Sequence, residues 1–277
     1  MFVAALQMVS TQSLADNLAQ AKRLLQQAAD QGAELAVLPE YFCLIGAKDD
    51  DKLAIQERFG AGPIQDFMAA QAQQLGLWIV AGTMPLTPEA PRSADGPARV
   101  LNSSLAFDPQ GVCVARYDKM HLFRFDNGRE AYDESRVLQA GTQPTQFALP
   151  SKDGHVWQVG MSVCYDLRFA ELYRGYAAQG VDLLLVPSAF THTTGQAHWE
   201  VLLRARAIEN LCFVTAAAQG GVHPSGRRTW GQSMVVDPWG VVLAQQAQEP
   251  SVVLAECDAA ELARWRSQLP ALQHRQL

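Results

Sequence analysis

Runs of apolar residues alternate with amphipathic stretches along most of the chain. The apolar run at 2–9 is followed from about Ser13 by leucines and alanines at helical spacing, which predicts a strand and then a helix that stops near Gly32. The same order repeats as a strand at 35–38, a helix near 63–75 and a strand at 77–82. This alternation is typical of an α/β protein with large buried sheets.

The second half of the chain continues the alternation. It predicts strands at 155–163, 182–188 and 211–218, with helices near 169–179 and 197–210. Each half also contains two apolar runs joined by an Asp-Pro-x-Gly turn, at 108–111 and 237–240. Pro presets the backbone of such a turn and Gly relaxes its end. Two hairpins of this kind suggest two similar β-rich units that face each other.

No stretch of the sequence has the length and composition of a domain linker. The Pro-rich stretch 83–99 predicts a loop, but it is too short to separate two domains. We therefore expect one domain over residues 1–277. The tail from about residue 260, which contains Trp265 and Leu269, is expected to form a helix that packs on this body or on a partner chain.

Composition excludes several classes of protein. The chain has 277 residues, of which 48% are hydrophobic and 18% charged, and its formal net charge of −6 does not suit a nucleic-acid surface. No apolar run approaches the roughly 18 residues that span a membrane, and the N-terminus lacks the basic flank of a signal peptide. The five cysteines are widely spaced, without a Cys-x-x-Cys pair, which favours neither a disulfide framework nor a zinc site. We expect a cytoplasmic protein.

Three reactive side chains each follow an apolar strand, at the edge where α/β sheets collect ligands: Glu40, Lys119 and Cys164. A thiol with a pKa of about 8.5 needs a base or a nearby cation to act as a nucleophile. Glu40 could take the thiol proton, and Lys119 could stabilise the thiolate and then an oxyanion. Each residue also has an ordinary explanation, as a helix-cap carboxylate, a surface lysine and a core thiol.

The sequence motifs around these residues resemble those of a known family. "LPEYF", "DKMHLF" and "VCYDLRFAELYR", in this order, are similar to the nitrilase superfamily of carbon–nitrogen hydrolases, and the resemblance runs from residue 2 to about 260. It implies an α-β-β-α sandwich, a homodimer or larger homo-oligomer, and no metal or organic cofactor. It implies that Glu40 is the general base, Lys119 the oxyanion-stabilising cation and Cys164 the nucleophile that forms a thioester. Glu134 matches a second glutamate that orients the lysine, although a surface carboxylate is the alternative.

Two later segments resemble particular amidase branches of the superfamily. "PSAFTHTTGQAHWEVLLRARAIEN" is similar to both branches that act on open-chain 2-oxo acid amides, whereas the stretch with His223 and Arg228 is more similar to deaminated-glutathione amidases than to ω-amidases. The resemblance predicts cleavage of deaminated glutathione to 2-oxoglutarate and Cys-Gly. The alternatives are an ω-amidase acting on 2-oxoglutaramate, another nitrilase, carbamoylase or amidase, and a non-catalytic interaction protein.

A 2-oxo acid substrate carries a carboxylate that the site must hold. Arg168, four residues after Cys164, offers a planar fork suited to bidentate binding, although an ion pair with Asp166 or Glu171 would also explain it. Room for Cys-Gly would come from loops such as 122–134 and 219–229. His198 and Glu200 are expected to start a helix rather than to act in catalysis. The other candidate substrate-binding residues are Tyr165, Phe190, Thr191 and Thr194.

Overall fold

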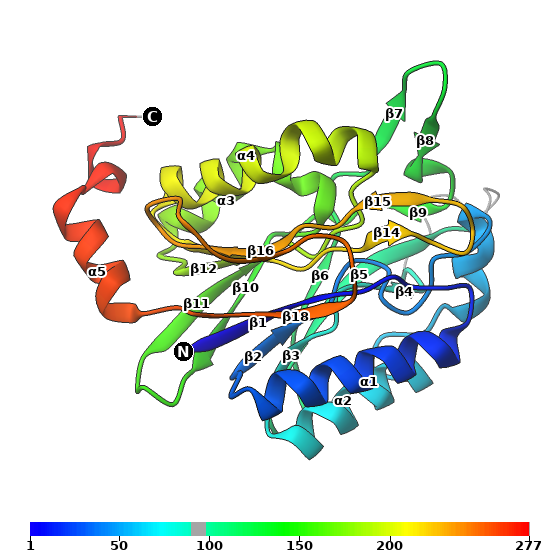
Figure 1. The fold of residues 1–277 in the computed structure, drawn as a ribbon, viewed down its shortest axis with the longest axis horizontal. Helices are drawn as coiled ribbons and strands as arrows, with labels where there is room; N and C mark the ends of the chain where they lie inside the picture. Colours follow the sequence, from blue (N-terminus) through cyan, green and yellow to red (C-terminus); the bar gives the residue numbers. More distant parts are fainter. Residues whose placement is uncertain (90–97, 277) are drawn as a thin grey trace.

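Two β-sheets lie face to face, and a pair of helices covers the outer face of each sheet (Figure 1). The computed structural model describes residues 1–89 and 98–276 of the chain. The first sheet is covered by α1 (Leu14–Asp30) and α2 (Pro63–Leu75), and the second by α3 (Ala170–Ala178) and α4 (His192–Asn210). The structure therefore confirms the predicted four-layer α-β-β-α sandwich.

The first sheet begins with parallel strands and continues into an antiparallel hairpin. Its order is β18-β1-β2-β3-β5-β4, with β1, β2 and β3 parallel, and β6 and β9 also pair with β5. Strand β18 returns from late in the chain to lie beside β1, with Phe2 opposite Glu256. The strands are β1 (Phe2–Gln7), β2 (Leu35–Val37), β3 (Trp78–Val80), β4 (Met84–Leu86), β5 (Val100–Phe107), β6 (Cys113–Asp118), β9 (Leu138–Gln139) and β18 (Ser251–Glu256).

The second sheet repeats this plan. Its order is β10-β11-β12-β13-β16-β17, with β11, β12 and β13 parallel and β16 and β17 forming the antiparallel hairpin. Both hairpins, β5–β6 and β16–β17, turn at the Asp-Pro-x-Gly sequences, which agrees with the prediction of two similar units. The strands are β10 (Thr145–Pro150), β11 (Val156–Met161), β12 (Leu183–Leu185), β13 (Phe213–Ala216), β16 (Ser233–Val236) and β17 (Val242–Gln246).

Strand β1 shows why the central strands are apolar along their whole length. Val3 and Ala5 point into the core between the two sheets, whereas Ala4 and Leu6 point into the core beneath α1 and α2. Successive side chains of a strand point to opposite faces. Because both faces of the sheet are buried, the alternation produces a continuous apolar run rather than an alternating one.

Helix α4 begins five residues earlier than the predicted start near 197. Its N-cap is Thr191, whose side-chain oxygen accepts a hydrogen bond from the backbone N–H of Thr194. Threonine is among the residues that satisfy a free N–H group at a helix start in this way. Thr191 and Thr194 therefore form the cap and first turn of the helix, and His198 lies inside the helix rather than at its start.

Three predicted loops contain strands. Residues 84–86 of the predicted loop 83–99 form β4, which pairs with β5, while 90–97 lie outside the described residues. The predicted loop 122–134 forms a hairpin of β7 (Arg124–Asp126) and β8 (Ala131–Asp133), and the stretch 219–229 enters a hairpin of β14 (Gly220–Val222) and β15 (Arg228–Trp230). Each of these strands has only three residues, which is too few to show the apolar alternation on which strand prediction depends.

The tail forms helix α5 (Ala259–Gln268), which contacts the second sheet and its connections. Trp265 stacks on Trp239 with ring centroids 4.2 Å apart. Arg266 donates a hydrogen bond to Asp182 at 2.7 Å. Short 3₁₀ helices complete the fold: η1 (Asp49–Ile55), η2 (Glu134–Arg136), η3 (Cys164–Arg168) and η4 (Ala271–His274). Within the described residues, no helix has the length and apolar character needed to cross a membrane.

Candidate active site

The three residues of the predicted triad come from the ends of three strands, two in the first sheet and one in the second. Glu40 lies three residues beyond β2, Lys119 directly follows β6, and Cys164 lies three residues beyond β11. Their exposed fractions are 1%, 0% and 8% respectively. Glu40 and Cys164 line one pocket, and Lys119 lies next to the pocket, where it donates a hydrogen bond to Glu40. The sandwich therefore brings the three predicted groups to one place.

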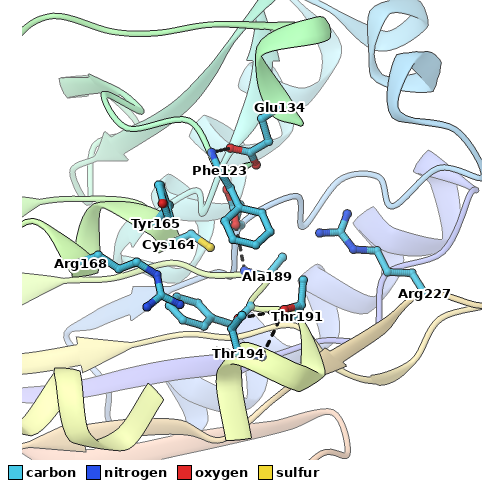
Figure 2. A pocket seen from close by; sticks show the side chains of 11 residues that line it. Phe123, Glu134, Cys164, Tyr165, Arg168, Ala189, Thr191, Thr194 and Arg227 are labelled. Carbon is cyan, nitrogen blue, oxygen red and sulfur yellow. Dashed lines mark hydrogen bonds between the residues drawn. The ribbon is translucent and has the colours of Figure 1, made fainter. Parts of the chain in front are cut away.

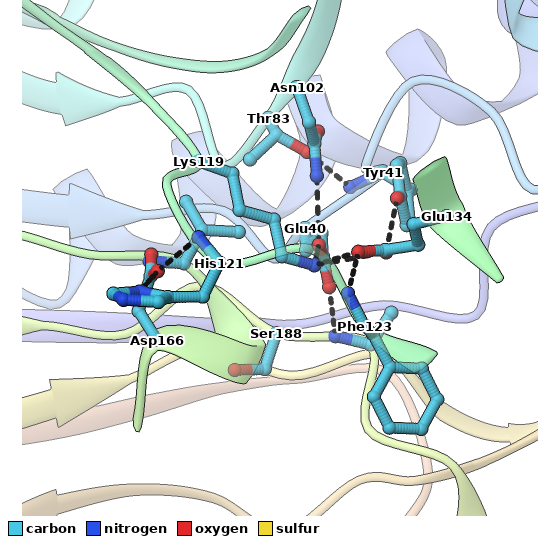
Figure 3. A network of polar contacts seen from close by, with 12 residues as sticks. Glu40, Tyr41, Thr83, Asn102, Lys119, His121, Phe123, Glu134, Asp166 and Ser188 are labelled. Atoms are coloured by element: carbon cyan, nitrogen blue, oxygen red, sulfur yellow. Dashed lines mark hydrogen bonds and ion pairs between the residues drawn. The ribbon is translucent and has the colours of Figure 1, made fainter. Parts of the chain in front are cut away.

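Lys119 lies between two carboxylates, that of the buried Glu40 and that of the largely buried Glu134 (Figure 3). Its Nζ donates to Oε1 of Glu40 at 2.9 Å, and to Oε1 and Oε2 of Glu134 at 2.9 and 2.8 Å. Glu134, at the start of η2, is therefore not a surface carboxylate. One ammonium group with three donors can serve both partners at once. The cluster carries one positive and two negative charges at the base of the pocket.

The two carboxylates are held by further donors that the sequence analysis did not identify. Glu40 accepts from Asn102 Nδ2 at 2.8 Å through Oε1 and from the backbone N–H of Ala189 at 2.9 Å through Oε2. Glu134 accepts from the Tyr41 hydroxyl at 2.9 Å and from the backbone N–H of Phe123 at 2.7 Å. The sequence signal for Asn102 was its place in a polar run, 102–104, within the otherwise apolar strand β5.

The charges in this cluster fix the protonation of Lys119 and Glu134. Burial by itself would lower the pKa of Lys119, but the charges of Glu134 and Glu40 outweigh burial and raise that pKa. Burial would likewise raise the pKa of the Glu134 carboxyl, but the Lys119 charge and the hydrogen bonds to Glu134 outweigh it and lower the pKa. Lys119 is therefore a permanent cation and Glu134 its permanent counter-ion near neutral pH.

Cys164 begins the tight turn η3 with a backbone conformation that is rare outside glycine. Its φ is +51°, and its N–H donates to the carbonyl of Pro187 at 2.9 Å. Such conformations are strained for side chains with a Cβ and are often found at functional sites. Burial raises the pKa of the Cys164 thiol well above its usual value, and the Glu40 charge raises it further, while Lys119 opposes the rise. The resting side chain is a thiol that needs a base to ionise.

Asp166 connects the turn that holds Cys164 to the segment that carries Lys119 (Figure 3). Its Oδ2 accepts from the Tyr117 hydroxyl at 2.7 Å and from the N–H of Val163 at 2.9 Å. Its Oδ1 accepts from the N–H of His121 at 3.0 Å and lies 2.7 Å from the ring Nδ1 of His121. Asp166 is fully buried, so these bonds are shielded from water. The sequence analysis considered Asp166 only as an ion-pair partner of Arg168.

All the predicted substrate-binding residues line the pocket (Figure 2). Arg168 has its guanidinium 3.2 Å from the ring Nδ1 of His198, and no ion pair links it to Asp166 or Glu171 in the part of the chain that the structure describes. The hydroxyls of Thr191 and Thr194 are 2.8 Å apart at the start of α4. The pocket residues besides Cys164 are Glu40, Phe123, Glu134, Tyr165, Arg168, Ala189, Phe190, Thr191, Thr194 and Arg227.

Arg227 was not identified from the sequence, which had drawn attention to its neighbours. His223 is buried, with Nδ1 2.9 Å from the Ser10 carbonyl and Nε2 2.7 Å from the Thr229 hydroxyl, so its contacts hold the β14–β15 hairpin rather than a substrate. Arg228 is exposed on β15. Neighbouring side chains of a strand-like segment point to opposite sides, which places Arg227 rather than Arg228 at the pocket. Among the described residues, no cluster of three or more His, Cys, Asp or Glu has a metal-binding arrangement.

Comparison with known proteins places this site in a family. The carbon–nitrogen hydrolase family profile matches residues 2–267. A protein of Yersinia enterocolitica named deaminated glutathione amidase is 41% identical over 98% of this chain and 92% of its own length. The omega-amidase NIT2 of Danio rerio is 34% identical over 94% of this chain and 89% of its own length.

A solved structure extends the similarity from sequence to fold. Nit3 of Saccharomyces cerevisiae, a member of branch 10 of the nitrilase superfamily, is 26% identical, with a TM-score of 0.85 over 100% of this chain and 97% of its own. The predicted resemblance is confirmed by the profile, the relatives and the fold together. The chain belongs to the carbon–nitrogen hydrolase family.

Proposed function

We propose that this protein is a thiol-dependent amidase that cleaves the C–N bond of a 2-oxo dicarboxylic acid amide, with deaminated glutathione as its substrate. The observation that carries the proposal is the pocket in which Cys164 lies beside Glu40, with Lys119 held between Glu40 and Glu134. The relatives at about 40% identity are named for this activity. No metal or organic cofactor enters the proposed reaction.

In the first half of the reaction, Glu40 removes the proton of Cys164 as the sulfur attacks the amide carbon. Because the Cys164 pKa is raised, a free thiolate is rare and the base must act during attack. Lys119 and a backbone N–H after Cys164 stabilise the negative charge that forms on the carbonyl oxygen. The protonated Glu40 then gives its proton to the departing amine, and the C–N bond breaks to leave a thioester on Cys164.

In the second half, Glu40 takes a proton from a water molecule, whose oxygen attacks the thioester carbon. The C–S bond breaks, the acid leaves, and the proton returns to the sulfur, so one water is consumed for each amide cleaved. Lys119 keeps its charge through both halves because Glu134 stays ionised beside it. In this scheme Glu134 positions the lysine and does not itself transfer a proton.

On the acid side of the amide, Arg168 binds the 2-oxo acid carboxylate. Its guanidinium lines the pocket, stacks near the rings of Tyr165 and Phe190 at 5.6 Å from each centroid, and has no carboxylate partner among the described residues. The hydroxyls of Thr191 and Thr194 are the nearest additional donors, although they also cap α4. Both deaminated glutathione and 2-oxoglutaramate present this same end, so these contacts do not distinguish the two.

The test is steady-state hydrolysis of deaminated glutathione and 2-oxoglutaramate by the purified protein, with Cys164→Ala as the control. We expect deaminated glutathione to be cleaved with the higher kcat/KM, and Cys164→Ala to lose at least about 10³-fold of it. A preference for 2-oxoglutaramate, which the similarity to omega-amidase NIT2 allows, would assign the ω-amidase activity instead. Retention of a tenth of the activity by Cys164→Ala would refute the thioester route.

We also propose that the protein is a cytoplasmic homo-oligomer and that 1–277 acts as one catalytic domain. All five cysteines are free, which supports a reducing compartment. Val201 and Ile208, one heptad apart on α4, are 68% and 46% exposed, and Trp239 and Val241 at the β16–β17 turn are 49% and 50% exposed. Exposed apolar groups of this size favour a subunit contact. Light scattering with size exclusion tests it, and a monomeric mass at micromolar concentration would refute it.

A further inference from the structure

Arg227 lies on the pocket and has an unsatisfied side chain. Its Nε is buried and has no hydrogen-bond partner, and no carboxylate pairs with its guanidinium in the described residues. The guanidinium lies over the ring of Tyr132, 5.8 Å from the centroid. Arg227 is only partly exposed, and a buried N–H donor without a partner is unfavourable by itself. An anionic group in the pocket would satisfy it.

The two pocket arginines lie on opposite sides of the site. Figure 2 shows Arg168 on the side of Cys164 and Tyr165, and Arg227 across the pocket, with its guanidinium pointing inward past Phe123. Arg168 ends η3, the turn between β11 and α3, whereas Arg227 lies in the loop of the β14–β15 hairpin. A substrate with a carboxylate at each end would therefore meet one cation on each side of the nucleophile.

The hairpin that carries Arg227 is fixed in place rather than free to swing. The two ring nitrogens of His223 lie within hydrogen-bond distance of the Ser10 carbonyl and the Thr229 hydroxyl. The backbone N–H of Trp230 donates to the carbonyl of Phe190 at 3.0 Å, and Thr229 pairs with Thr191 as an isolated bridge. Because these bonds already position the hairpin, binding at Arg227 would require little further ordering of the chain.

We propose that Arg227 binds the carboxylate of the leaving group, which in deaminated glutathione is the C-terminal glycine carboxylate of Cys-Gly. The proposal rests on the proposed amidase function and names the residue that distinguishes its two candidate substrates. With Arg168 on the acid-side carboxylate, Arg227 is the remaining pocket cation without a partner, and a guanidinium binds a carboxylate in bidentate geometry. 2-Oxoglutaramate releases ammonia and has no group to offer Arg227. Arg227 therefore sets specificity for a peptide leaving group.

The test compares Arg227→Gln with the wild type on three substrates: deaminated glutathione, its C-terminal carboxamide, and 2-oxoglutaramate. We expect kcat/KM for deaminated glutathione to fall about 10–100-fold, which is the range for one charge-assisted contact. Hydrolysis of 2-oxoglutaramate should change less than about threefold. In the wild type, kcat/KM should fall by a similar factor when the carboxamide replaces the acid. In Arg227→Gln the same replacement should cause no further fall in kcat/KM, because the contact with the carboxylate is already absent. Arg228→Gln, one residue away and exposed, is the matched control.

The outcomes separate the two proposals. Equal losses by Arg227→Gln on all three substrates would refute the role of Arg227 in leaving-group recognition, while leaving the amidase function intact. A wild type that cleaves the acid and the carboxamide equally well would refute it too. If the wild type cleaves none of the three, the proposed function itself fails. Thermal melts of both variants check folding, and Arg227→Lys should recover only part of the lost kcat/KM, since an ammonium cannot bind in the bidentate geometry.

Discussion

Replacement of Asp166 by Asn should loosen the junction between the nucleophile and the lysine. The carboxylate accepts from the N–H groups of Val163 and His121 through different oxygens. An amide has one acceptor oxygen, so in either orientation its NH₂ group faces one of these two backbone donors. A buried donor without a partner costs about 1–3 kcal/mol. The remaining bonds lose the charge that strengthened them, which adds about 1 kcal/mol.

The expected loss is therefore about 2–4 kcal/mol in the free energy of unfolding. For chains of roughly this size, 1 kcal/mol shifts Tm by about 2–4 °C, so we expect Tm to fall by about 4–16 °C. The turn that holds Cys164 begins at Val163, whose N–H is one of the affected donors. We expect kcat to fall at least about tenfold at a temperature where the variant is fully folded, with a smaller change in KM.

Calorimetry or urea unfolding measures the first effect, and amide hydrolysis at 20 °C the second. Asp237→Asn is the contrasting control, because Asp237 is also buried but accepts from the backbone N–H groups of Trp239 and Val241 through one oxygen, Oδ1, in a turn that does not line the pocket. An amide oxygen can keep both bonds, so this variant should lose less Tm than Asp166→Asn and should keep its kcat. If Asp166→Asn kept its Tm within about 1 °C, the hydrogen-bond reasoning would be wrong. If it lost stability but kept full kcat, Asp166 would not position the nucleophile.

The buried charges and the cysteines allow three further tests. Lys119→Met leaves Glu40 and Glu134 as unneutralised neighbours and removes the oxyanion cation, so kcat/KM should fall at least about 10³-fold; a loss below tenfold would contradict this role. A small alkylating agent should label Cys164 faster than the half-buried Cys113, with loss of activity, because Cys164 faces the pocket and Glu40 can take its proton as the sulfur attacks; peptide mass mapping would show the difference. Burial lowers the pKa of His223. Below about pH 6.5 this side chain therefore binds a proton in the unfolded chain but not in the folded chain. The free energy of unfolding should therefore be highest above about pH 6.5 and fall as the pH drops toward the lowered pKa; His223→Gln should flatten this fall between pH 7 and 5 in urea unfolding, and an unchanged slope would count against the assignment.

The sequence determined the layers of the fold, because the apolar pattern reports burial directly. The helix at 63–75 appears where the periodicity placed it, and the apolar runs on either side of the turn at 108–111 form β5 and β6. Continuous apolar runs predicted sheets that are buried on both faces, as β1 shows. The short hairpins at 124–133 and 220–230 were missed, since each of their strands has only three residues, too few to show an alternating pattern. Their positions depend on contacts with distant segments, such as His223 with Ser10.

Some residues of the active site could likewise be predicted from the sequence, and others only from the structure. Glu40, Lys119, Cys164 and Glu134 could be named from motifs, because the reaction demands particular side-chain types at the ends of strands. Nothing local marks Asn102 as a partner of Glu40 or Asp166 as a partner of His121, because these hydrogen bonds join residues 62 and 45 positions apart.

Arg227 shows most clearly what could not be predicted from the sequence. The sequence offered two adjacent arginines, and only the direction in which the β14–β15 hairpin faces places Arg227 on the pocket and Arg228 in solvent. Residue type thus determined what chemistry the chain contains. The tertiary structure decided which charges share a buried space, because that depends on contacts between elements far apart in the chain.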